Sequence, residues 1–158
     1  MVLPSSLLVV RLGAIGDVVN ALVLATALKD EYAQVRIGWV VHPLTAPLVQ
    51  GHPSVDRVHV WQRAGLAEFR RVVRELRAER YELAIDLQRL QKSALLARLS
   101  GAPRVLGFDR ARTKEASWVW TNEHLAGTQP GHHRVEQYLE VARHLGCAAP
   151  VARRVLPR

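Results

Sequence analysis

The chain has 158 residues and a single cysteine, Cys147, which excludes an internal disulfide and any zinc site built from several cysteines. No apolar run approaches the roughly 18 residues that a membrane-spanning helix needs. Residues 1–6 lack the basic segment and the long apolar segment of a secretory signal peptide. These absences predict a cytoplasmic protein without a membrane span.

Lysine is also scarce, although the chain is basic. Only Lys29, Lys92 and Lys114 are lysines, so arginine supplies most of the 22 basic residues that outweigh 14 acidic ones and give a net charge of +8. This charge suits an anionic partner, such as nucleic acid, a phosphorylated sugar or an acidic membrane surface. Arginine enrichment can equally follow from genome composition, so the charge alone does not select a partner.

Two common nucleotide-binding motifs are missing. Residues 12–17 contain G-x-x-G rather than G-x-G-x-x-G, and no acidic residue ends the second predicted strand to hold a ribose. The G-x-x-x-x-G-K-[ST] phosphate loop is absent as well. His132 and His133 lack the i,i+4 spacing and the carboxylate partners of a metal site. The sequence therefore argues against a nicotinamide enzyme, a P-loop NTPase and a metal centre.

Apolar residues recur along the chain with periods that alternate between strand and helix. The length fits one domain with a substantial core. Together with the right-handed crossover rule, the alternation predicts an α/β fold, a Rossmann-like doubly wound parallel sheet. Strands are predicted at 7–10, 35–41, 55–61, 81–88 and 103–108, and helices at 17–28, 44–49, 66–76, 93–99 and 135–145, while 116–120 fit neither period.

The first strand, turn and helix are the segment around which the chain is organised. Gly13 and Gly16 predict a tight turn at which the backbone can approach a ligand closely. Asp17 stands where the helix should begin, at the sheet edge where ligands bind in such folds. Its carboxylate could cap the helix or act as a general base. The helix dipole favours the ionised carboxylate, which also makes it a weaker base, so both interpretations stay open.

Other polar residues are predicted near the same edge. Some follow the fourth and fifth strands, where they could simply cap the next helix or form a solvated loop. Others begin the last helix, whose N-terminus would favour a bound phosphate. They are Asp86, Gln88, Lys92, Arg110, Arg112, Lys114, His132, His133 and Arg134.

The predicted helix 66–76 is amphipathic, with apolar residues at three- and four-residue spacing on one side. Its other side carries Arg70, Arg71, Arg74 and Arg77. This basic run could bind phosphate or simply form a solvated helix face, and the pattern alone favours the solvated face.

Taken together, these segments resemble the N-terminal half of bacterial lipopolysaccharide heptosyltransferases, glycosyltransferase family 9. No single motif is decisive, but their order and spacing are specific, and the resemblance covers nearly the whole chain. The matching segments are 11–18, 51–58, 76–88, 92–95, 107–109 and 133–136.

The resemblance implies the GT-B architecture, in which two Rossmann-like domains face each other across a cleft. Residues 1–148 would form the N-terminal acceptor-side domain and 149–158 the start of the interdomain linker, with the C-terminal donor-binding domain absent. The implied reaction is inverting transfer of heptose from ADP-heptose to the lipopolysaccharide inner core, with Asp17 as the base. No metal or other cofactor is expected, and this chain alone should be inactive. Peripheral contact with the inner membrane fits this activity, and no nucleic acid is expected.

The resemblance also implies which residues bind the acceptor. Basic residues suit its phosphates and carboxylates, and residues of the first turn and of the later motifs match or neighbour the family's acceptor-binding positions. They are Arg11, Gly13, Ala14, Gly16, Arg63, Gln88, Lys92, Arg112, Lys114 and His133.

The sequence departs from the family pattern at three places. Arg89 stands where the family usually has glycine, Gln137 stands where it usually has arginine, and 113–115 match the usual Ala-Arg-Glu only loosely. These differences bear on the acceptor's identity rather than on the fold. A rival from another class is a non-catalytic basic α/β module that binds an anionic glycolipid or nucleic acid.

Overall fold

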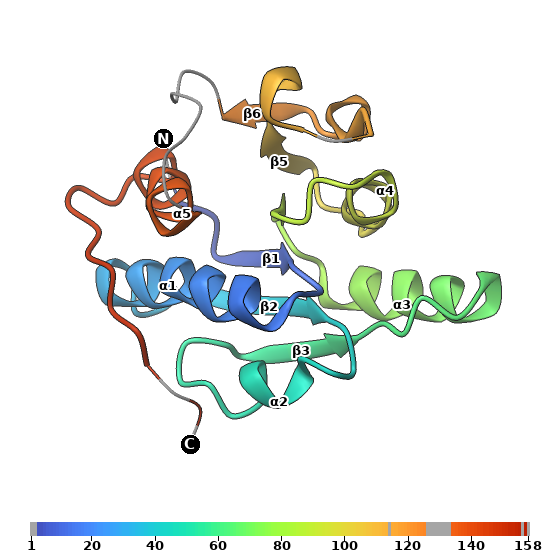
Figure 1. Cartoon of the computed structure of the whole chain (residues 1–158), viewed down its shortest axis with the longest axis horizontal. Coiled ribbons are helices and arrows are strands. Elements are labelled where there is room, and N and C mark those ends of the chain that lie inside the picture. Colours follow the sequence, from blue (N-terminus) through green and yellow to red (C-terminus); the bar gives the residue numbers. More distant parts are fainter. Residues whose placement is uncertain (1–2, 114, 126–133, 156, 158) are drawn as a thin grey trace.

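The computed structural model describes residues 3–113, 115–125, 134–155 and 157. Its sheet has six parallel strands in the order β3-β2-β1-β4-β5-β6 (Figure 1). The chain builds outward from β1 to β3, crosses to β4 on the other side of β1, and continues outward. This order confirms the predicted doubly wound α/β fold and creates a switch point between β1 and β4. The strands are β1 (Ser6–Val10), β2 (Arg36–Val41), β3 (Arg57–Val60), β4 (Leu83–Asp86), β5 (Arg104–Phe108) and β6 (Glu123–Leu125).

Helices cover both faces of the sheet, and Figure 1 shows α1 and α5 on one side with α3 and α4 on the other. Each of these helices buries apolar side chains against the sheet. The helices are α1 (Ile15–Glu31), α2 (Ala46–Val49), α3 (Leu66–Glu79), α4 (Gln91–Leu99) and α5 (Arg134–His144), with 3-10 turns η1 (Arg110–Arg112) and η2 (Ser117–Trp120).

Strand β1 is the shared wall of two hydrophobic cores. Leu7 and Val9 point into the core under α1 and α5, whereas Leu8 and Val10 point into the core under α3 and α4. All four side chains are fully buried. Alternate residues of a strand face opposite sides, so a strand covered on both faces needs an uninterrupted apolar run, as this sequence has.

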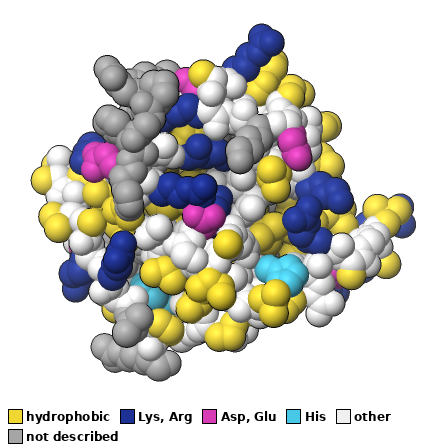
Figure 2. Space-filling model, viewed as in Figure 1, with side chains coloured by type: hydrophobic (Ala, Val, Ile, Leu, Met, Phe, Trp, Pro, Cys, Tyr) yellow, Lys and Arg dark blue, Asp and Glu magenta, His cyan; other side chains and the backbone are white. Residues whose placement is uncertain are grey.

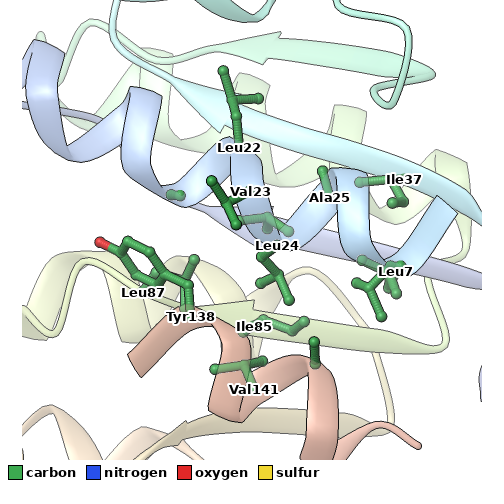
Figure 3. Close-up of a cluster of buried hydrophobic side chains, with 14 of the residues drawn as sticks. Leu7, Leu22, Val23, Leu24, Ala25, Ile37, Ile85, Leu87, Tyr138 and Val141 are labelled. Atoms are coloured by element: carbon green, nitrogen blue, oxygen red, sulfur yellow. The ribbon is translucent and has the colours of Figure 1, made fainter. Parts of the chain in front are cut away.

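Helix α1 is buried on more than one side. Val23 and Leu24 are buried along with Leu22, because α5 packs against the flank of α1 (Figure 3). From α5, Tyr138 and Val141 complete this core. The packing brings α5, which comes late in the sequence, beside the turn that follows β1.

The structure differs from the sequence predictions at two elements. Helix α1 begins before Asp17, which is its third residue, and the N-cap Ala14 makes no side-chain capping bond. The N-cap interpretation of Asp17 is therefore wrong. Strand β6 was not predicted, because its three residues are too few to show a period; its Glu123 pairs with Arg104 of β5 at 2.9 Å.

The tail after α5 returns to the domain. Arg153 pairs with Asp30 of α1 at 2.5 Å, and Arg154 donates to Asn20 Oδ1 of the same helix at 3.2 Å. The ring Nε2 of the buried His52 lies 2.9 Å from the Val155 carbonyl oxygen. These contacts lay the predicted linker segment along the domain surface. Within the described ranges, no helix is long and apolar enough to cross a membrane.

Candidate functional site

A pocket of about 500 Å³ lies at the carboxyl ends of β1 and β4, at the switch point of the sheet. Two loops and two helices build it: the turn after β1, the first turn of α1, the loop after β4, and the first residues of α5. Its lining residues are Arg11, Gly13, Ala14, Asp17, Gln88, Arg89, Leu90, Arg134, Gln137 and Tyr138.

The carboxylate of Asp17 is held between two guanidinium groups. Its Oδ2 lies 2.5 Å from Arg11, and its Oδ1 lies 2.5 Å from Arg134. Arg11 is buried, whereas the side chain of Arg134 is 55% exposed. One oxygen is therefore fixed by an immobile partner, and the other is covered by a cation that a ligand could displace.

Arg11 joins the ends of β1 and β4. Its guanidinium donates to the Leu87 carbonyl at 2.8 Å, and its own carbonyl accepts from the Trp39 indole at 3.1 Å. The Arg11 Nε is buried without a hydrogen-bond partner among the residues that the structure describes. Gln88 adds a second link, because its Oε1 accepts from the Leu12 backbone N–H at 3.0 Å. Both side chains fix the turn that carries Asp17.

Asp86, the last residue of β4, shapes the loop that contributes Gln88 and Arg89. Its Oδ1 accepts from the Gln88 and Arg89 backbone N–H groups at 3.1 and 3.3 Å. The side chain is fully buried, and burial raises the pKa of this carboxyl to about 6, although Ser93, the two backbone N–H groups and the nearby Arg11 oppose that rise. Asp86 lies beneath the pocket and holds its wall in place.

Arg89 occupies a strained and crowded position in the pocket. Its φ of 62° is left-handed, a conformation that glycine adopts freely and that costs other residues roughly 1 kcal/mol. Its guanidinium lies 3.9 Å from the centroid of the Phe108 ring and donates to Gln137 Oε1 of α5. Burial lowers the pKa of this guanidinium, and the nearby Arg112, Arg11 and Arg134 lower it further. Two departures from the family pattern, Arg89 and Gln137, thus contact each other.

The predicted site residues separate into groups. Arg11, Gly13, Ala14, Asp17 and Gln88 line the pocket together. Gly13, Ala14 and Gln88 also line an adjoining hollow of about 330 Å³ that includes Arg63, and Arg63 and Lys92 line a further hollow of about 370 Å³. Gly16 is exposed on the first turn of α1 and is not among the lining residues of the main pocket. Lys114 and His133 lie outside the described residues.

The structure differs from the prediction that Arg112 binds the acceptor. Its side chain is 8% exposed, and its guanidinium pairs with Glu140 of α5 at 3.2 Å and with Asp109 at 3.4 Å. It also donates to the Leu125 carbonyl at 2.5 Å. These partners tie η1 to β6 and α5, so this arginine fastens the fold and is not available to an acceptor.

Arg134 lines the pocket near the sheet edge where the sequence predicted it, although its contact with Asp17 was not predicted. Four further lining residues, from α5 and the loop after β4, were not predicted as site residues: Gln137, Tyr138, Arg89 and Leu90. The family-like segment 133–136 was a signal for Arg134, but nothing in the sequence indicated that α5 packs beside the turn after β1. Among the described residues, no group of three or more His, Cys, Asp or Glu side chains could hold a metal ion.

The fold is thus that of a Rossmann-like domain with a pocket at its switch point. The sequence profile of glycosyltransferase family 9 (heptosyltransferase) matches residues 69–154. The chain belongs to this family.

Curated relatives extend the match over most of the chain. Lipopolysaccharide heptosyltransferase 1 of Escherichia coli K12 is 31% identical over 156 residues, which cover 90% of this chain and 48% of that protein. The Haemophilus influenzae lipopolysaccharide core heptosyltransferase OpsX is 22% identical over 143 residues, which cover 90% of this chain and 41% of that protein. The chain therefore spans less than half the length of these relatives.

Solved structures agree with the fold. The Escherichia coli heptosyltransferase WaaC with ADP superimposes with a TM-score of 0.82 at 26% identity, over 94% of this chain and 50% of that one. A glycosyltransferase family 9 structure from Veillonella parvula gives a TM-score of 0.83 at 18% identity, over all of this chain and 46% of that one.

Proposed function

We propose that this chain is the acceptor-side domain of an inverting GT-B heptosyltransferase that transfers heptose from ADP-heptose to the lipopolysaccharide inner core in the cytoplasm. The observation that carries the proposal is the Asp17 carboxylate, which faces a switch-point pocket and is held by Arg11 and Arg134. Membership of glycosyltransferase family 9 and relatives named as heptosyltransferases support the substrate class.

In this proposal Asp17 is the general base. Arg11 keeps the carboxylate oriented, and the acceptor displaces the exposed Arg134 from Oδ1. Asp17 then takes the proton of the acceptor hydroxyl while that oxygen forms a bond to the anomeric carbon of the donor. The bond from this carbon to the ADP oxygen breaks on the opposite side, so the configuration inverts and ADP leaves with the bonding electrons. The donor half-site belongs to the part of the relatives beyond the matched region, with 149–158 leading toward it.

The charges of the pocket fit an anionic acceptor. Arg11, Arg89 and Arg134 contribute three cations to a lining whose acidic member is Asp17. Phosphate or carboxylate groups of the acceptor would balance this excess, since guanidinium groups bind both through paired hydrogen bonds. Arg63 and Lys92 extend the cationic lining into the adjoining hollows. The proposed reaction uses no metal, so a chelator should leave transfer unchanged.

The test measures transfer from ADP-heptose to a truncated acceptor of lipid A and Kdo, using a protein of the relatives' full length. Asp17→Ala should lower kcat by about 10²- to 10⁴-fold with acceptor binding nearly intact, because the base is lost while the cations remain. Asp30→Ala is the matched control, since Asp30 is an exposed carboxylate on the same helix. The 158-residue chain alone should give no transfer.

The same experiment tests the rival function. A non-catalytic binding module would show no transfer in any form of the protein, and Asp17→Ala would change only its stability. A nucleic-acid binder would in addition lose affinity steeply with salt. Transfer that survives Asp17→Ala at the rate of Asp30→Ala would remove Asp17 from the mechanism while leaving the family and the fold in place.

A further inference from the structure

A second surface lies along the seam between α3 and α4, away from Asp17. Two hollows of about 370 and 630 Å³ open there side by side, and both are lined by Leu66 and Phe69. We name these two hollows and their rims the α3–α4 surface. Their remaining apolar lining is Trp61, Leu95, Ala67, Val73 and Leu99.

Apolar side chains of this surface reach solvent. Leu66 is 63% exposed at the first position of α3. Phe69 and Val73 pack against the core beneath and remain half-buried. Leu66, Phe69 and Val73 therefore line one of the hollows together and leave apolar surface in contact with solvent.

Cations border the apolar hollows. Arg63 and Lys92 line one hollow, Arg70 and Arg74 line the other, and all four are exposed. Figure 2 shows Lys and Arg side chains gathered beside hydrophobic ones toward the end of the molecule where α3 and α4 lie in Figure 1.

No acidic residue lines either hollow within the described part of the chain. The carboxylate of Glu68, on the same helix, instead accepts from the Gln62 and Ala64 backbone N–H groups at 2.6 and 2.7 Å. The cations at the rim are therefore not neutralised by a carboxylate in these hollows.

We propose that the α3–α4 surface docks the protein on the anionic surface of a lipid bilayer. Leu66 and the exposed parts of its apolar neighbours would enter the headgroup region, and the surrounding Arg and Lys side chains would contact lipid phosphates. Charge complementarity carries this choice of partner, because apolar side chains ringed by exposed cations match a surface with phosphates above acyl chains. In this proposal, the exposed arginine run on α3 binds a partner in addition to forming a solvated helix face.

The position of the surface fits the proposed function, on which this inference rests. Arg63 lines both the hollow that contains Lys92 and a second hollow that contains Gly13 and Gln88. This second hollow adjoins the Asp17 pocket, because Gly13 and Gln88 line that pocket as well. A lipid-linked acceptor could therefore keep its acyl chains in the bilayer while its sugar groups extend along this row of hollows to the base.

The test is co-sedimentation of the 158-residue chain with vesicles of phosphatidylethanolamine and phosphatidylglycerol, compared with vesicles of phosphatidylcholine alone. We expect binding to the anionic vesicles. The double variant Arg70→Glu/Arg74→Glu should lower the partition coefficient by about tenfold or more. Arg153→Glu/Arg154→Glu is the matched control, because it changes the net charge equally at the tail, away from α3. Circular dichroism verifies that each variant is folded.

A second pair of variants tests the apolar contact. Leu66→Gln should weaken vesicle binding several-fold at high salt, where charge attraction is screened. Val119→Gln removes a comparably exposed apolar side chain on η2 and should change little. Equal losses in the α3 variants and in their controls would show adsorption by net charge alone and overturn the proposal. So would an absence of vesicle binding, or equal binding to neutral vesicles.

Activity assays separate this inference from the proposed function. In the full-length protein, Arg70→Glu/Arg74→Glu should leave transfer to an acceptor lacking acyl chains unchanged and reduce transfer to an acceptor embedded in anionic vesicles. Vesicle docking without transfer of any kind would leave the surface standing and reject the transferase. If the variant transfers heptose to both acceptors at the rates of the unmodified protein, the proposed transferase function stands and the proposed docking surface is rejected.

Discussion

The Asp17 pocket and the α3–α4 surface are both rich in arginine, yet the two regions hold their cations differently. In the pocket, Arg11 and Arg89 are largely buried and are bound to carbonyl, carboxylate or amide oxygens. On the surface, Arg70 and Arg74 stand exposed beside apolar hollows. The buried guanidinium group of Arg11 fixes the position of the Asp17 carboxylate, whereas the exposed ones of Arg70 and Arg74 are accessible to a partner. Burial thus separates two groups of arginines, to which we assign different roles.

The largest expected difference between the two regions is in pH dependence. The pKa of Asp86 is raised to about 6 in the folded state, so the folded state binds more protons than the unfolded one between pH 4 and 6. The stability contributed by this group is therefore present below pH 4 and lost as the pH rises toward 6, by about 3 kcal/mol. Asp86→Asn should remove this loss, which urea unfolding across pH 4 to 7 would measure. Asp30→Asn is the exposed control, and an identical pH slope in Asp86→Asn and the unmodified chain would contradict the prediction.

The next largest effect is at the buried arginine of the pocket. Arg11→Met leaves the Leu87 carbonyl without its charged donor and removes one partner of Asp17, which should lower the free energy of unfolding by about 2 kcal/mol. Arg134 still contacts Asp17, so the domain should remain folded. Urea denaturation provides the measurement. A loss below about 0.5 kcal/mol, the range of ordinary surface substitutions, would place Arg11 with the surface arginines instead.

A smaller effect should reveal the coupling between the two departures from the family pattern. Gln137→Arg alone puts a second guanidinium against Arg89 and should destabilise the domain by about 1 kcal/mol. In the Arg89→Gly background the same substitution should cost little, because the opposing charge is gone and glycine accepts the left-handed backbone. A double-mutant cycle of unfolding free energies measures this coupling. Additive effects within about 0.4 kcal/mol would show that the two positions are independent.

The smallest effect should be on the surface. Arg70→Gln should change the unfolding free energy by less than about 0.5 kcal/mol, because Arg70 is exposed and its loss leaves no buried partner behind. Urea denaturation of this variant and of Arg11→Met under the same conditions compares the loss of unfolding free energy at an exposed arginine with the loss at a buried one. A loss of unfolding free energy as large as that of Arg11→Met would mean that Arg70 stabilises the fold and is not available to bind a partner.

The sequence predicted the fold because its signals are local. Residues 7–10 form an unbroken apolar run, and α3 has a regular three- and four-residue spacing. The position of Asp17 after a glycine turn placed it at the ligand-binding edge for the same reason. Strand β6 escaped prediction because three residues carry no period.

The rest of the site depends on contacts between distant parts of the chain. Arg112 looked suited to an acceptor, but its partners Glu140 and Leu125 come from α5 and β6. Arg134 reaches Asp17 only because α5 packs along α1. The local sequence around a basic loop residue does not indicate whether a carboxylate from a later element will form an ion pair with it. The sequence therefore indicated that this region is positively charged, but not which of its basic residues are available to a ligand.

Strand β1 separates two cores and is hydrogen-bonded on both sides, to β2 and to β4. Its amide protons should therefore exchange with solvent only when the whole domain unfolds, whereas the short edge strand β6 should exchange through local opening. The turn that carries Asp17 begins directly after this most protected strand. Asp17, the proposed base, is thus attached to the strand that we expect to open last, and the geometry around its carboxylate should persist for as long as the domain is folded.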